Sequence, residues 1–393
     1  MVEKYKVKTL NNISRVGLEL FSKHKYIITE DDNADAILLR SFNLHETPLN
    51  SSLSVVGRAG AGVNNIPVDK LSTRGVPVFN TPGANANAVK ELVIAAILIS
   101  ARNIVPAISY VAGLQCDRDQ IQTQVERAKK KFSGVEIQGR KIAVIGLGKI
   151  GSLVAGACIN LGMRVVGYDP TITVDGAWGL STEIIRAKSL EEAARDADFV
   201  SIHIPLTKNT RGVINSNVLA KIKNTGILIN FSRADIVEND AVILALKNKK
   251  IGGYVTDFPT SDLNSVAGVC SLPHLGASTT EAEENCASMV AKQIIDYLEN
   301  GNIVHSVNLP EVIMSRESAF RVGIANKNVP NMVGQISTLL AANNVNIHNM
   351  LNKSRGELAY TLVDVDSPVN KQVIDAISTI EGVLRVRYMP LRH

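Results

Sequence analysis

Three polar stretches of the sequence each follow an apolar run and hold side chains suited to chemistry on a small acid. They are Asn230-Phe231-Ser232-Arg233-Ala234, Thr256-Asp257-Phe258-Pro259-Thr260-Ser261-Asp262 and Leu272-Pro273-His274-Leu275-Gly276-Ala277-Ser278. An arginine at the carboxyl end of a strand can bind a carboxylate with its two-pronged guanidinium group, which makes Arg233 a candidate. A neutral imidazole at His274 can take the proton of a hydroxyl group while a hydride leaves, and can return it in reverse. Each stretch also fits a purely structural strand end, and spacing alone leaves both interpretations open.

The stretch Lys141–Pro170 is typical of a dinucleotide-binding unit. An apolar, β-branched run over 142–145 predicts a buried strand, and Gly-Leu-Gly-Lys-Ile-Gly and a helical segment follow it. In this order of elements Gly146 allows a tight turn, Gly148 lets the backbone approach a pyrophosphate, and Gly151 lets the helix lie close to the strand. The free N–H groups at the helix start would bind the phosphates. A glycine-rich turn without function is the alternative.

Asp169 ends the next apolar run, 163–168, and follows the first glycine of the motif at roughly the 20-residue spacing expected of a ribose-binding carboxylate. A carboxylate there accepts hydrogen bonds from the ribose hydroxyls and repels a 2′-phosphate. The sequence therefore predicts NAD rather than NADP as cofactor.

Composition excludes several other classes. Charged residues make up 20% of the 393 residues and hydrophobic ones 45%, which is ordinary for globular domains. The net charge of +5 comes from scattered Lys and Arg residues, apart from the run Lys129–Lys131. This pattern indicates a solvated surface or an anionic substrate rather than a nucleic-acid partner. We therefore expect no nucleic-acid binding. We also expect no membrane binding, because no apolar run is long enough to span a bilayer.

The cysteines predict a reducing compartment. Cys116, Cys158, Cys270 and Cys286 are far apart, and neither a CxxC pair nor a nearby His pair accompanies them. We expect free thiols, no metal site and a cytoplasmic protein, since the first ten residues also lack the apolar core of a secretory signal.

The first hundred residues alternate short apolar runs with helical segments, which predicts a parallel sheet with strands at 36–39, 55–56 and 76–79. Arg40 and Arg58 each end such a strand, and glycine-rich turns follow at 57–62 and 80–85. Loops at the carboxyl ends of parallel strands are where α/β folds bind ligands. Both arginines are candidate ligand-binding residues, with an ordinary surface cation as the alternative.

Later segments complete two doubly wound domains. Runs at 199–204, 226–230 and 251–257 predict further strands of the dinucleotide-binding sheet, and 277–300 predicts an amphipathic helix with Glu281 and Glu283 in its first turn. We assign residues 1–100 and 280–310 to a discontinuous, flavodoxin-like substrate-binding domain and 101–279 to a Rossmann domain. An apolar helix pair over 89–109 breaks near Asn103 and Pro106, and the charged helix at 117–131 is a candidate protruding element or subunit contact.

The last part of the chain changes pattern. Residues 318–393 read as strand, helix, strand, strand, helix and strand, which predicts a small ferredoxin-like βαββαβ unit. It holds no catalytic cluster, so binding or dimerisation is its expected role.

The motifs GRAGAGVNNI, NTPGANANAVKEL, VIGLGKIG, HIPLT, NFSRADIV and PHLGAST together resemble the D-2-hydroxyacid dehydrogenase family, and within it the phosphoglycerate dehydrogenase branch. The resemblance covers nearly all of residues 40–290. It implies NAD-dependent oxidation of 3-phospho-D-glycerate to 3-phosphohydroxypyruvate, the first step of L-serine biosynthesis. The C-terminal unit resembles an ACT domain, an amino-acid-sensing module. A homodimer or homotetramer is also implied.

The resemblance assigns roles to individual residues. It implies that Arg233 binds the substrate carboxylate and that His274 is the acid/base. The substrate pocket would be lined by Arg40, Arg58, Ala59, Gly60 and Asn85. NAD would be bound by Gly146, Gly148, Lys149, Ile150, Gly151, Asp169, His203, Pro205, Thr210, Phe231, Ser232, Asp257, Gly276 and Ala277.

Two departures from the family pattern bear on activity and regulation. The family usually carries a Glu after the Asp257 position to pair with the catalytic His, and here either Ser261 or Asp262 aligns with it; we assign the role to Asp262. The ACT-like unit has Asn328-Val329-Pro330-Asn331 where the family has an Asn followed by a Pro-Gly turn. Its candidate effector ligands are Asn328 and Asn346, for L-serine or another amino acid.

Two other functions compete with this assignment. One is another D-2-hydroxyacid dehydrogenase, acting on glycerate, lactate or hydroxyisocaproate. The other is an NAD(H)-sensing, corepressor-like interaction protein. The positive charge and the two arginines favour a phosphorylated substrate.

Overall fold

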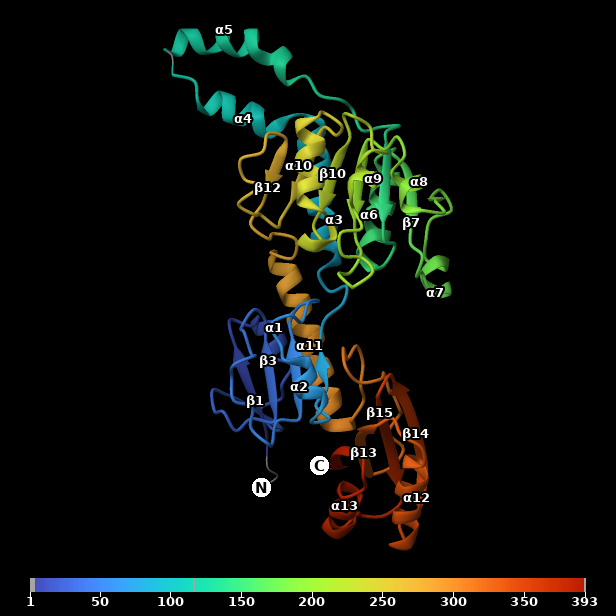
Figure 1. Ribbon diagram of the computed structural model, residues 1–393. Coiled ribbons are helices and arrows are strands. Elements are labelled where there is room, and N and C mark those ends of the chain that lie inside the picture. Colours follow the sequence, from blue (N-terminus) through green and yellow to red (C-terminus); the bar gives the residue numbers. More distant parts are fainter. Residues whose placement is uncertain (1–3, 116, 392–393) are drawn as a thin grey trace. The chain divides into compact units, whose positions relative to one another are not determined.

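The computed structural model describes residues 4–115 and 117–391, and the chain divides into two compact units. The first contains the chain up to Asn85 together with the chain from Thr280 onward, and the second is Ala86–Thr279. Figure 1 follows both along the sequence. The first unit is thus discontinuous in sequence, whereas the second is a single stretch.

A five-stranded parallel sheet forms the first part of the first unit. Its order is β2-β1-β3-β4-β5, which is the flavodoxin-like order. The central β3 has the bounds expected from the sequence, and all residues of β3 and β5 are buried, whereas β1, β2 and β4 are partly exposed. The elements are β1 (Tyr5–Leu10), α1 (Arg15–Leu18), β2 (Tyr26–Thr29), β3 (Ala36–Leu39), β4 (Val55–Arg58), α2 (Val68–Ser72) and β5 (Val78–Phe79).

Helix α11 (Thr280–Asn300) completes the core of this sheet. Its side chains at Cys286, Val290, Ile294 and Leu298 recur every fourth residue, so they share one face, and all four are buried. They join one hydrophobic cluster with strand residues such as Val7. The helix is therefore part of the first unit although it lies far from that sheet in sequence.

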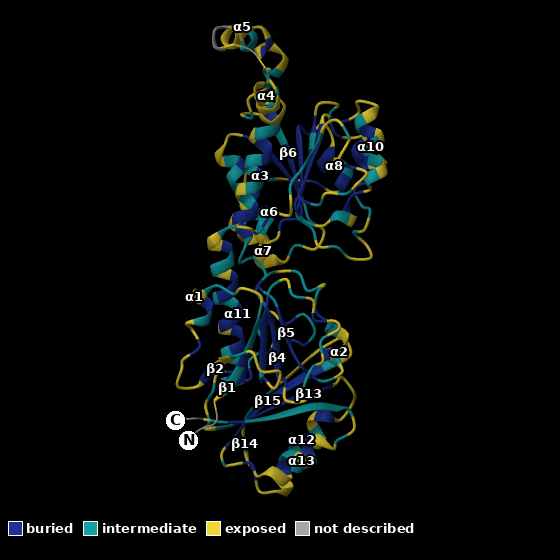
Figure 2. Ribbon diagram, turned by 90° about the vertical axis from the view of Figure 1, so that its left-hand side faces the viewer, coloured by how far each residue is buried: buried dark blue, intermediate teal, exposed yellow. Residues whose placement is uncertain are grey.

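The second unit is built on a seven-stranded parallel sheet of order β12-β11-β10-β9-β6-β7-β8, the doubly wound order of a Rossmann domain. Its central strands are buried between helices on both faces, including α3, α6 and α8 (Figure 2). The strands are β6 (Lys141–Ile145), β7 (Arg164–Tyr168), β8 (Ile185–Arg186), β9 (Phe199–Ile202), β10 (Ile227–Asn230), β11 (Gly253–Thr256) and β12 (Val269–Ser271). The helices are α3 (Ala86–Ala101), α4 (Ile104–Ala112), α5 (Arg118–Ala128), α6 (Lys149–Asn160), α7 (Val174–Trp178), α8 (Leu190–Ala194), α9 (Ser216–Leu219) and α10 (Asn239–Lys247).

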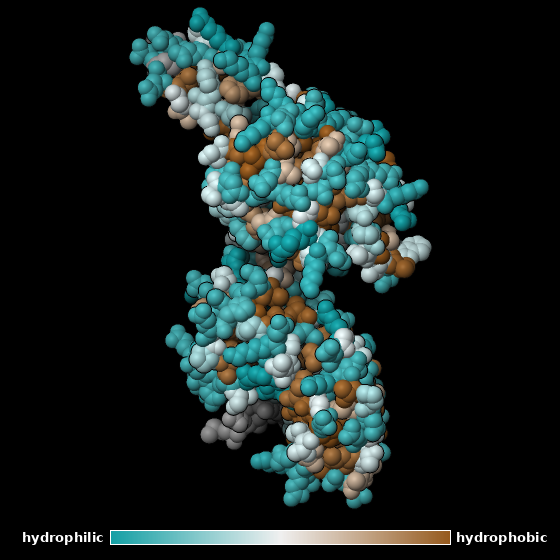
Figure 3. Space-filling view, viewed as in Figure 1, coloured by the Kyte–Doolittle hydropathy of each residue, from teal (hydrophilic) through white to brown (hydrophobic). Residues whose placement is uncertain are grey.

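Helices α4 and α5 form an arm that extends from the body of this unit (Figures 1 and 2). The predicted break between α3 and α4 is present, since Asn103 takes a left-handed conformation with φ of 50°. Helix α4 buries none of its residues although it is strongly apolar, and Figure 3 shows hydrophobic side chains exposed on the arm. No single helix within residues 4–115 and 117–391 is long and apolar enough to cross a membrane.

The C-terminal part of the first unit is the predicted βαββαβ fold. An antiparallel sheet of order β14-β15-β13-β16 carries two helices on one face. Side chains alternate between the faces, so Val322 and Ile324 of β13 pack under the helices whereas Ala325 faces α11. The elements are β13 (Phe320–Lys327), α12 (Met332–Ala342), β14 (Ile347–Arg355), β15 (Leu358–Val365), α13 (Lys371–Ser378) and β16 (Val383–Pro390).

Side chains of this C-terminal sheet and of the linker before it bind the end of α11. The five consecutive carbonyls of Tyr297–Gly301 each accept a hydrogen bond from one of them. Arg387 donates to Tyr297 and Leu298, Arg316 to Glu299, Arg321 to Asn300 and Tyr360 to Gly301. The last carbonyls of a helix lack partners within it, so these bonds cap α11.

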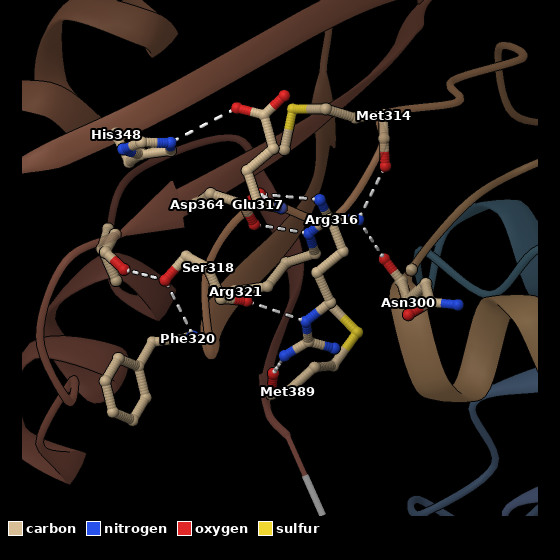
Figure 4. Close-up of polar contacts among 12 residues, drawn as sticks. Asn300, Met314, Arg316, Glu317, Ser318, Phe320, Arg321, His348, Asp364 and Met389 are labelled. Carbon is tan, nitrogen blue, oxygen red and sulfur yellow. Dashed lines mark hydrogen bonds and ion pairs between the residues drawn. The ribbon is translucent and has the colours of Figure 1, made fainter.

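Arg321 is the centre of this attachment (Figure 4). Its guanidinium group and the carboxylate of Asp364 are both fully buried and form two bonds, 2.6 Å from Nε to Oδ1 and 2.8 Å from Nη2 to Oδ2. The remaining N–H groups donate to the carbonyls of Asn300, Met314 and Ser315. A buried charge that is fully paired in this way is tolerated, whereas breaking the pair is costly.

The compact units and the predicted domains divide the chain differently at residues 86–100 and at the C-terminal sheet, which the first unit includes. We placed residues 86–100 in the first domain, but α3 packs against α6 in the core of the second unit. The functional division into three domains stays a prediction.

The cysteines that the structure describes, Cys158, Cys270 and Cys286, are free thiols, and Cys116 lies outside the described residues. Within the described part of the chain, no group of three or more His, Cys, Asp or Glu side chains is arranged to hold a metal ion.

Candidate active site

The glycine-rich turn between β6 and α6 needs glycine at two of its positions. Gly146 has φ of +90°, and a Cβ atom there would lie 2.5 Å from the carbonyl oxygen of His203. A Cβ on Gly151 would lie only 1.8 Å from the carbonyl oxygen of Gly146. Gly148 precedes α6 with open space where its side chain would be, so the N–H groups of the first turn face an accessible surface. This cradle fits a pyrophosphate.

Asp169 closes the other side of the same turn. Its Oδ2 accepts a 2.9 Å hydrogen bond from the N–H of Leu147, and its Oδ1 accepts from the N–H and the hydroxyl of Thr171. These bonds orient the carboxylate at the end of β7. Among the bonds of the described residues, Oδ2 accepts only the one from Leu147 and has a second lone pair, so Asp169 can still accept from a ribose.

A cleft of about 1030 Å³ lies along this edge of the sheet. Of the residues predicted to bind NAD, it is lined by Gly146, Gly148, Lys149, Asp169, His203, Pro205 and Thr210. Ile150 packs partly against the core instead. The cleft also has lining residues that the sequence did not single out, among them Thr173, Asp175 and Gly176 around α7.

His203 is held in the neutral form at this cleft. Burial lowers the pKa of His203 to about 3, and its Nε2 lies 2.8 Å from the hydroxyl of Ser201. Its Nδ1 is buried without a partner. A neutral ring with one open nitrogen can form a hydrogen bond to a bound group without adding charge.

The candidate catalytic residues lie after β10 and β11 in the second unit. Phe231 is buried, and the hydroxyl of Ser232 donates a 2.6 Å hydrogen bond to the carbonyl of Ile202 in β9. The backbone carbonyl of Arg233 accepts from the side-chain amide of Asn230 at 2.9 Å, and its Nη1 donates to the carbonyl of Ser232 at 2.6 Å. The turn that carries the guanidinium group is therefore fixed at both ends.

Asp257 organises the turn that carries His274. Its backbone carbonyl accepts a 3.0 Å hydrogen bond from the N–H of His274, and its Oδ2 accepts a 2.9 Å bond from the N–H of Gly276. His274 takes a left-handed conformation with φ of 47°, and its ring packs on Phe258 with centroids 4.9 Å apart. A strained backbone at a fixed turn is common at functional sites.

The carboxylate of Asp257 is itself unusual. It is almost fully buried, and its Oδ1 lacks a hydrogen-bond partner. Burial raises the pKa of Asp257, while the Gly276 N–H and the charges of His274 and Arg233 act to lower it. Arg233, Asp257 and His274 thus form one electrostatic group, with an open carboxylate oxygen among them.

Asp262 lies apart from this group. Its Oδ2 accepts hydrogen bonds from Asn239 and Thr260, both at 3.4 Å, and its Oδ1 accepts from the hydroxyl of Ser261 at 3.2 Å. The pKa of Asp262 is below its usual value. The main cause is a hydrogen bond from its own backbone N–H, and the bonds from these side chains add to it. Among the contacts of the described residues, the expected pairing of Asp262 with His274 is not formed, because these local groups bind the short Asp side chain.

The predicted substrate residues all belong to the first unit. Arg40 Nη1 lies 2.5 Å from Oε1 of Glu283, and the backbone carbonyl of Arg40 accepts a 2.9 Å bond from Arg58 Nε. A Cβ on Gly60 would lie 2.6 Å from Nη1 of Arg58, so the loop backbone passes close to that guanidinium group. Ala59 is buried, and the Oδ1 of Asn85 is buried without a partner. The sequence identifies Glu283 only as an acidic residue in the first turn of a predicted helix.

The candidate effector residues lie at the ends of strands in the C-terminal sheet. The Asn328 side chain donates to the carbonyl of Gly356 at 3.1 Å, and Asn346 is exposed. A separate hollow of about 510 Å³ beside α12 is lined by other residues, including Asn331, Gln335 and Thr338. Of these three, only Asn331 belongs to a turn that the sequence singles out.

Comparisons with known proteins agree with this geometry. The NAD binding domain of the D-isomer specific 2-hydroxyacid dehydrogenases matches residues 95–276. The D-3-phosphoglycerate dehydrogenase of Haemophilus influenzae is 31% identical over 352 residues, covering 86% of this chain and 81% of the relative. That of Escherichia coli K12 is 28% identical over 414 residues, covering 99% and 96%. That of Synechocystis is 34% identical over 318 residues, but the alignment covers 79% of this chain and only 55% of the relative.

Solved structures share the fold. The apo D-mandelate dehydrogenase of Rhodotorula graminis superposes with a TM-score of 0.65 at 24% identity, covering 80% of this chain and all of the other. The NAD⁺-bound 3-phosphoglycerate dehydrogenase of Entamoeba histolytica has a TM-score of 0.62 at 23% identity, covering 78% and 99%. The chain belongs to the D-isomer specific 2-hydroxyacid dehydrogenase family, and its second unit is the NAD-binding domain of that family.

Proposed function

We propose that the protein is an NAD-dependent D-2-hydroxyacid dehydrogenase that oxidises 3-phospho-D-glycerate to 3-phosphohydroxypyruvate, the first step of L-serine biosynthesis. The observation that carries the proposal is the group of Arg233, Asp257 and His274 in the same unit as the dinucleotide cleft. The names of the curated relatives supply the substrate.

NAD fits the second unit. The cradle at Gly146 and Gly151 has no room for side chains, and Asp169 is oriented to accept from a ribose that lacks a 2′-phosphate. Bound NAD supplies the acceptor for the hydride that leaves C2 of the hydroxy acid. The open Oδ1 of Asp257 and the open Nδ1 of His203 are further polar contacts for it.

Side chains of the protein bind the substrate and transfer its hydroxyl proton. Arg233 binds the carboxylate through its guanidinium group, whose turn is already fixed by Asn230. His274 takes the proton of the C2 hydroxyl during oxidation and returns it during reduction. Gly276 and Ala277 follow in the same turn, and the N–H of Gly276 holds the Asp257 carboxylate. In the first unit, Arg40, Arg58 and Asn85 bind the phosphate end, with the backbone of Ala59 and Gly60.

We also propose that the protein is a homodimer or homotetramer whose contacts include the arm of α4 and α5. The unburied apolar residues of α4 support this, because exposed apolar surface of this kind marks protein contacts. Sedimentation should give a dimer or tetramer, and an Ile108→Asp variant should shift it toward the monomer, since Ile108 is 63% exposed at the centre of α4.

The C-terminal sheet is proposed to be an ACT regulatory domain that binds L-serine or another amino acid. Its βαββαβ order and its position after the dehydrogenase part support this. Equilibrium binding of L-serine to the full chain tests it, and absence of a saturable site would remove it. The free thiols support a cytoplasmic location.

The test of the main proposal is NADH formation at 340 nm from 3-phosphoglycerate, with phosphohydroxypyruvate and NADH for the reverse reaction. We expect turnover in both directions and a higher kcat/KM than with glycerate. His274→Gln should lower kcat about 100- to 10,000-fold, and Arg233→Gln should mainly raise KM.

Other results would assign another function. Turnover of glycerate, lactate or hydroxyisocaproate, but not of 3-phosphoglycerate, identifies a different D-2-hydroxyacid dehydrogenase. Tight NADH binding without turnover of any of these acids identifies a sensor.

A further inference from the structure

Glu283 occupies a position that the proposed reaction does not explain. It lies in the first turn of α11, and its carboxylate forms an ion pair with Arg40 at 2.5 Å. Arg40 directly follows β3 and Arg58 is the last residue of the neighbouring β4, so two arginines and one glutamate form a cluster within the first unit. We refer to Arg40, Arg58 and Glu283 as the arginine cluster.

The packing of α11 fixes Glu283 beside the strand ends. Gly57 lies next to Arg58 in β4, and a Cβ on it would lie 2.5 Å from the side chain of Val290 in α11. The helix therefore touches the strand backbone directly. The buried thiol of Cys286, one turn after Glu283, is within electrostatic reach of all three charges of the cluster. The position of Glu283 beside the strand ends therefore follows from the packing of α11 on the sheet.

The two arginines are held differently. The Arg58 guanidinium donates from Nε to the Arg40 carbonyl and lies beneath the Gly60 backbone. The Arg40 guanidinium has its charge partner in Glu283, and both side chains are part-exposed, at 33% and 43%. An ion pair with this exposure is weak, so a stronger anion can displace the carboxylate.

We propose that Glu283 is a competing counter-ion that sets the affinity for the phosphate group of the substrate: it holds Arg40 in the free protein and releases it when the phosphate binds. This inference rests on the proposed function. A phosphate dianion offers more charge and more acceptor oxygens than a carboxylate, and it binds a guanidinium group with two parallel hydrogen bonds. A neutral hydroxymethyl group in the same place does not displace Glu283. The exchange therefore lowers the affinity for the phosphorylated acid, whereas an unphosphorylated acid leaves the ion pair of Arg40 and Glu283 intact.

The first test measures inorganic phosphate binding to the full chain by titration calorimetry, with NADH present to fill the dinucleotide cleft. Glu283→Gln removes the competing charge and should tighten phosphate binding about three- to tenfold. Arg40→Gln should weaken it by at least as much. Glu281→Gln is the matched control, because Glu281 is an exposed acid of the same helical turn.

The second test is kinetic. Glu283→Gln should lower KM for 3-phosphoglycerate by the same factor without changing kcat, and should leave KM for glycerate unchanged. If the effect came only from the total negative charge at the start of α11, Glu281→Gln would lower KM for 3-phosphoglycerate as much as Glu283→Gln does.

The outcomes separate the inference from the proposed function. Weaker phosphate binding in Glu283→Gln would mean that Glu283 only orients Arg40, and equal effects of the two glutamate variants would mean general electrostatics; either result overturns the inference. If phosphate binding changes as expected but 3-phosphoglycerate is not turned over, the inference about the arginine cluster stands and the proposed reaction is rejected.

Discussion

Two aspartates of the loop after β11 have opposite surroundings. Asp257 is buried and shares a turn with His274, whereas the carboxylate of Asp262 is exposed and bound to Asn239, Thr260 and Ser261. The family pattern directs attention to the later position, yet in this structure Asp257 is the aspartate whose pKa responds to the charge of His274. The loss of the longer Glu side chain explains the difference, because an Asp is satisfied by local donors before it reaches the histidine.

We therefore expect Asp262→Asn to change kcat/KM less than about threefold, because its contacts are local and solvent-exposed. Asp257→Asn keeps the size of the side chain but removes the charge beside Arg233 and His274, and should lower kcat/KM at least tenfold. Steady-state kinetics over a range of pH compares the two. A collapse of activity in Asp262→Asn alone would contradict this assignment and restore Asp262 as the partner of His274.

The neutral state of His203 has a consequence for acid stability. Its pKa is about 3 in the folded chain, against an ordinary value of 6.5. Between these values the unfolded chain binds a proton that the folded chain does not, so the free energy of unfolding falls as pH decreases.

Replacing His203 by Gln should remove this contribution. The difference in unfolding free energy between the wild type and His203→Gln should change by about 1.4 kcal/mol per pH unit between pH 6 and 4. Urea denaturation at several pH values measures it. The exposed His24 provides the control His24→Gln, and a slope equal to that control would show that His203 is protonated in the folded chain.

At the scale of elements, the turn from β6 into α6 is the part most sensitive to a single methyl group. Gly151→Ala would place Cβ 1.8 Å from the Gly146 carbonyl oxygen, whereas nothing lies within 4 Å of a Cβ on Gly156 in the same helix. We expect Gly151→Ala to weaken NADH binding more than tenfold and Gly156→Ala to stabilise the chain by about 0.5–1 kcal/mol.

Trp178, the single tryptophan, lies in α7, which borders the cleft, so energy transfer to NADH reports binding in both variants. Equal affinities for NADH would show that the turn tolerates a side chain and is not held by its glycines.

Elements were predictable where one local signal determines them. The β-branched run before Gly146 gave a buried strand, and the four-residue spacing in α11 gave an amphipathic helix. The ion pair of Arg40 with Glu283 had no such signal, because the strand and the helix that carry it are far apart in sequence. The same holds for Asp262, since alignment by spacing cannot show which donors surround a carboxylate. The unit to which α3 belongs also had no local signal, because an apolar helix fits the core of either unit.

At the scale of the whole molecule, the C-terminal sheet is not a loosely tethered addition. Its Tyr360, Leu362 and Met389 share one hydrophobic cluster with α11 and the first parallel sheet. The buried pair of Arg321 and Asp364 joins β13 and β15 to the linker and to the end of α11.

Breaking this pair should destabilise the first unit as a whole. Asp364→Asn leaves a buried guanidinium group without its counter-charge, and we expect a loss of about 3–5 kcal/mol in the free energy of unfolding. The exposed pair of Glu317 and His348 gives the control Glu317→Gln, with an expected loss below about 1 kcal/mol. A double change to Arg321→Met and Asp364→Leu should recover much of the stability. Thermal denaturation compares them, and similar melting temperatures for the two single variants would contradict the assigned role of the pair.

The capping of α11 by the last strands also dictates an order of assembly on the ribosome. The second unit is one uninterrupted stretch, so it can complete its core as soon as Thr279 has left the exit tunnel. Synthesis of the first unit begins earlier, but its folding cannot finish at that stage. Helix α11 and the arginines that bind the last carbonyls of α11 are translated only after the second unit. The first 85 residues must therefore wait, with an open hydrophobic face, until β16 emerges.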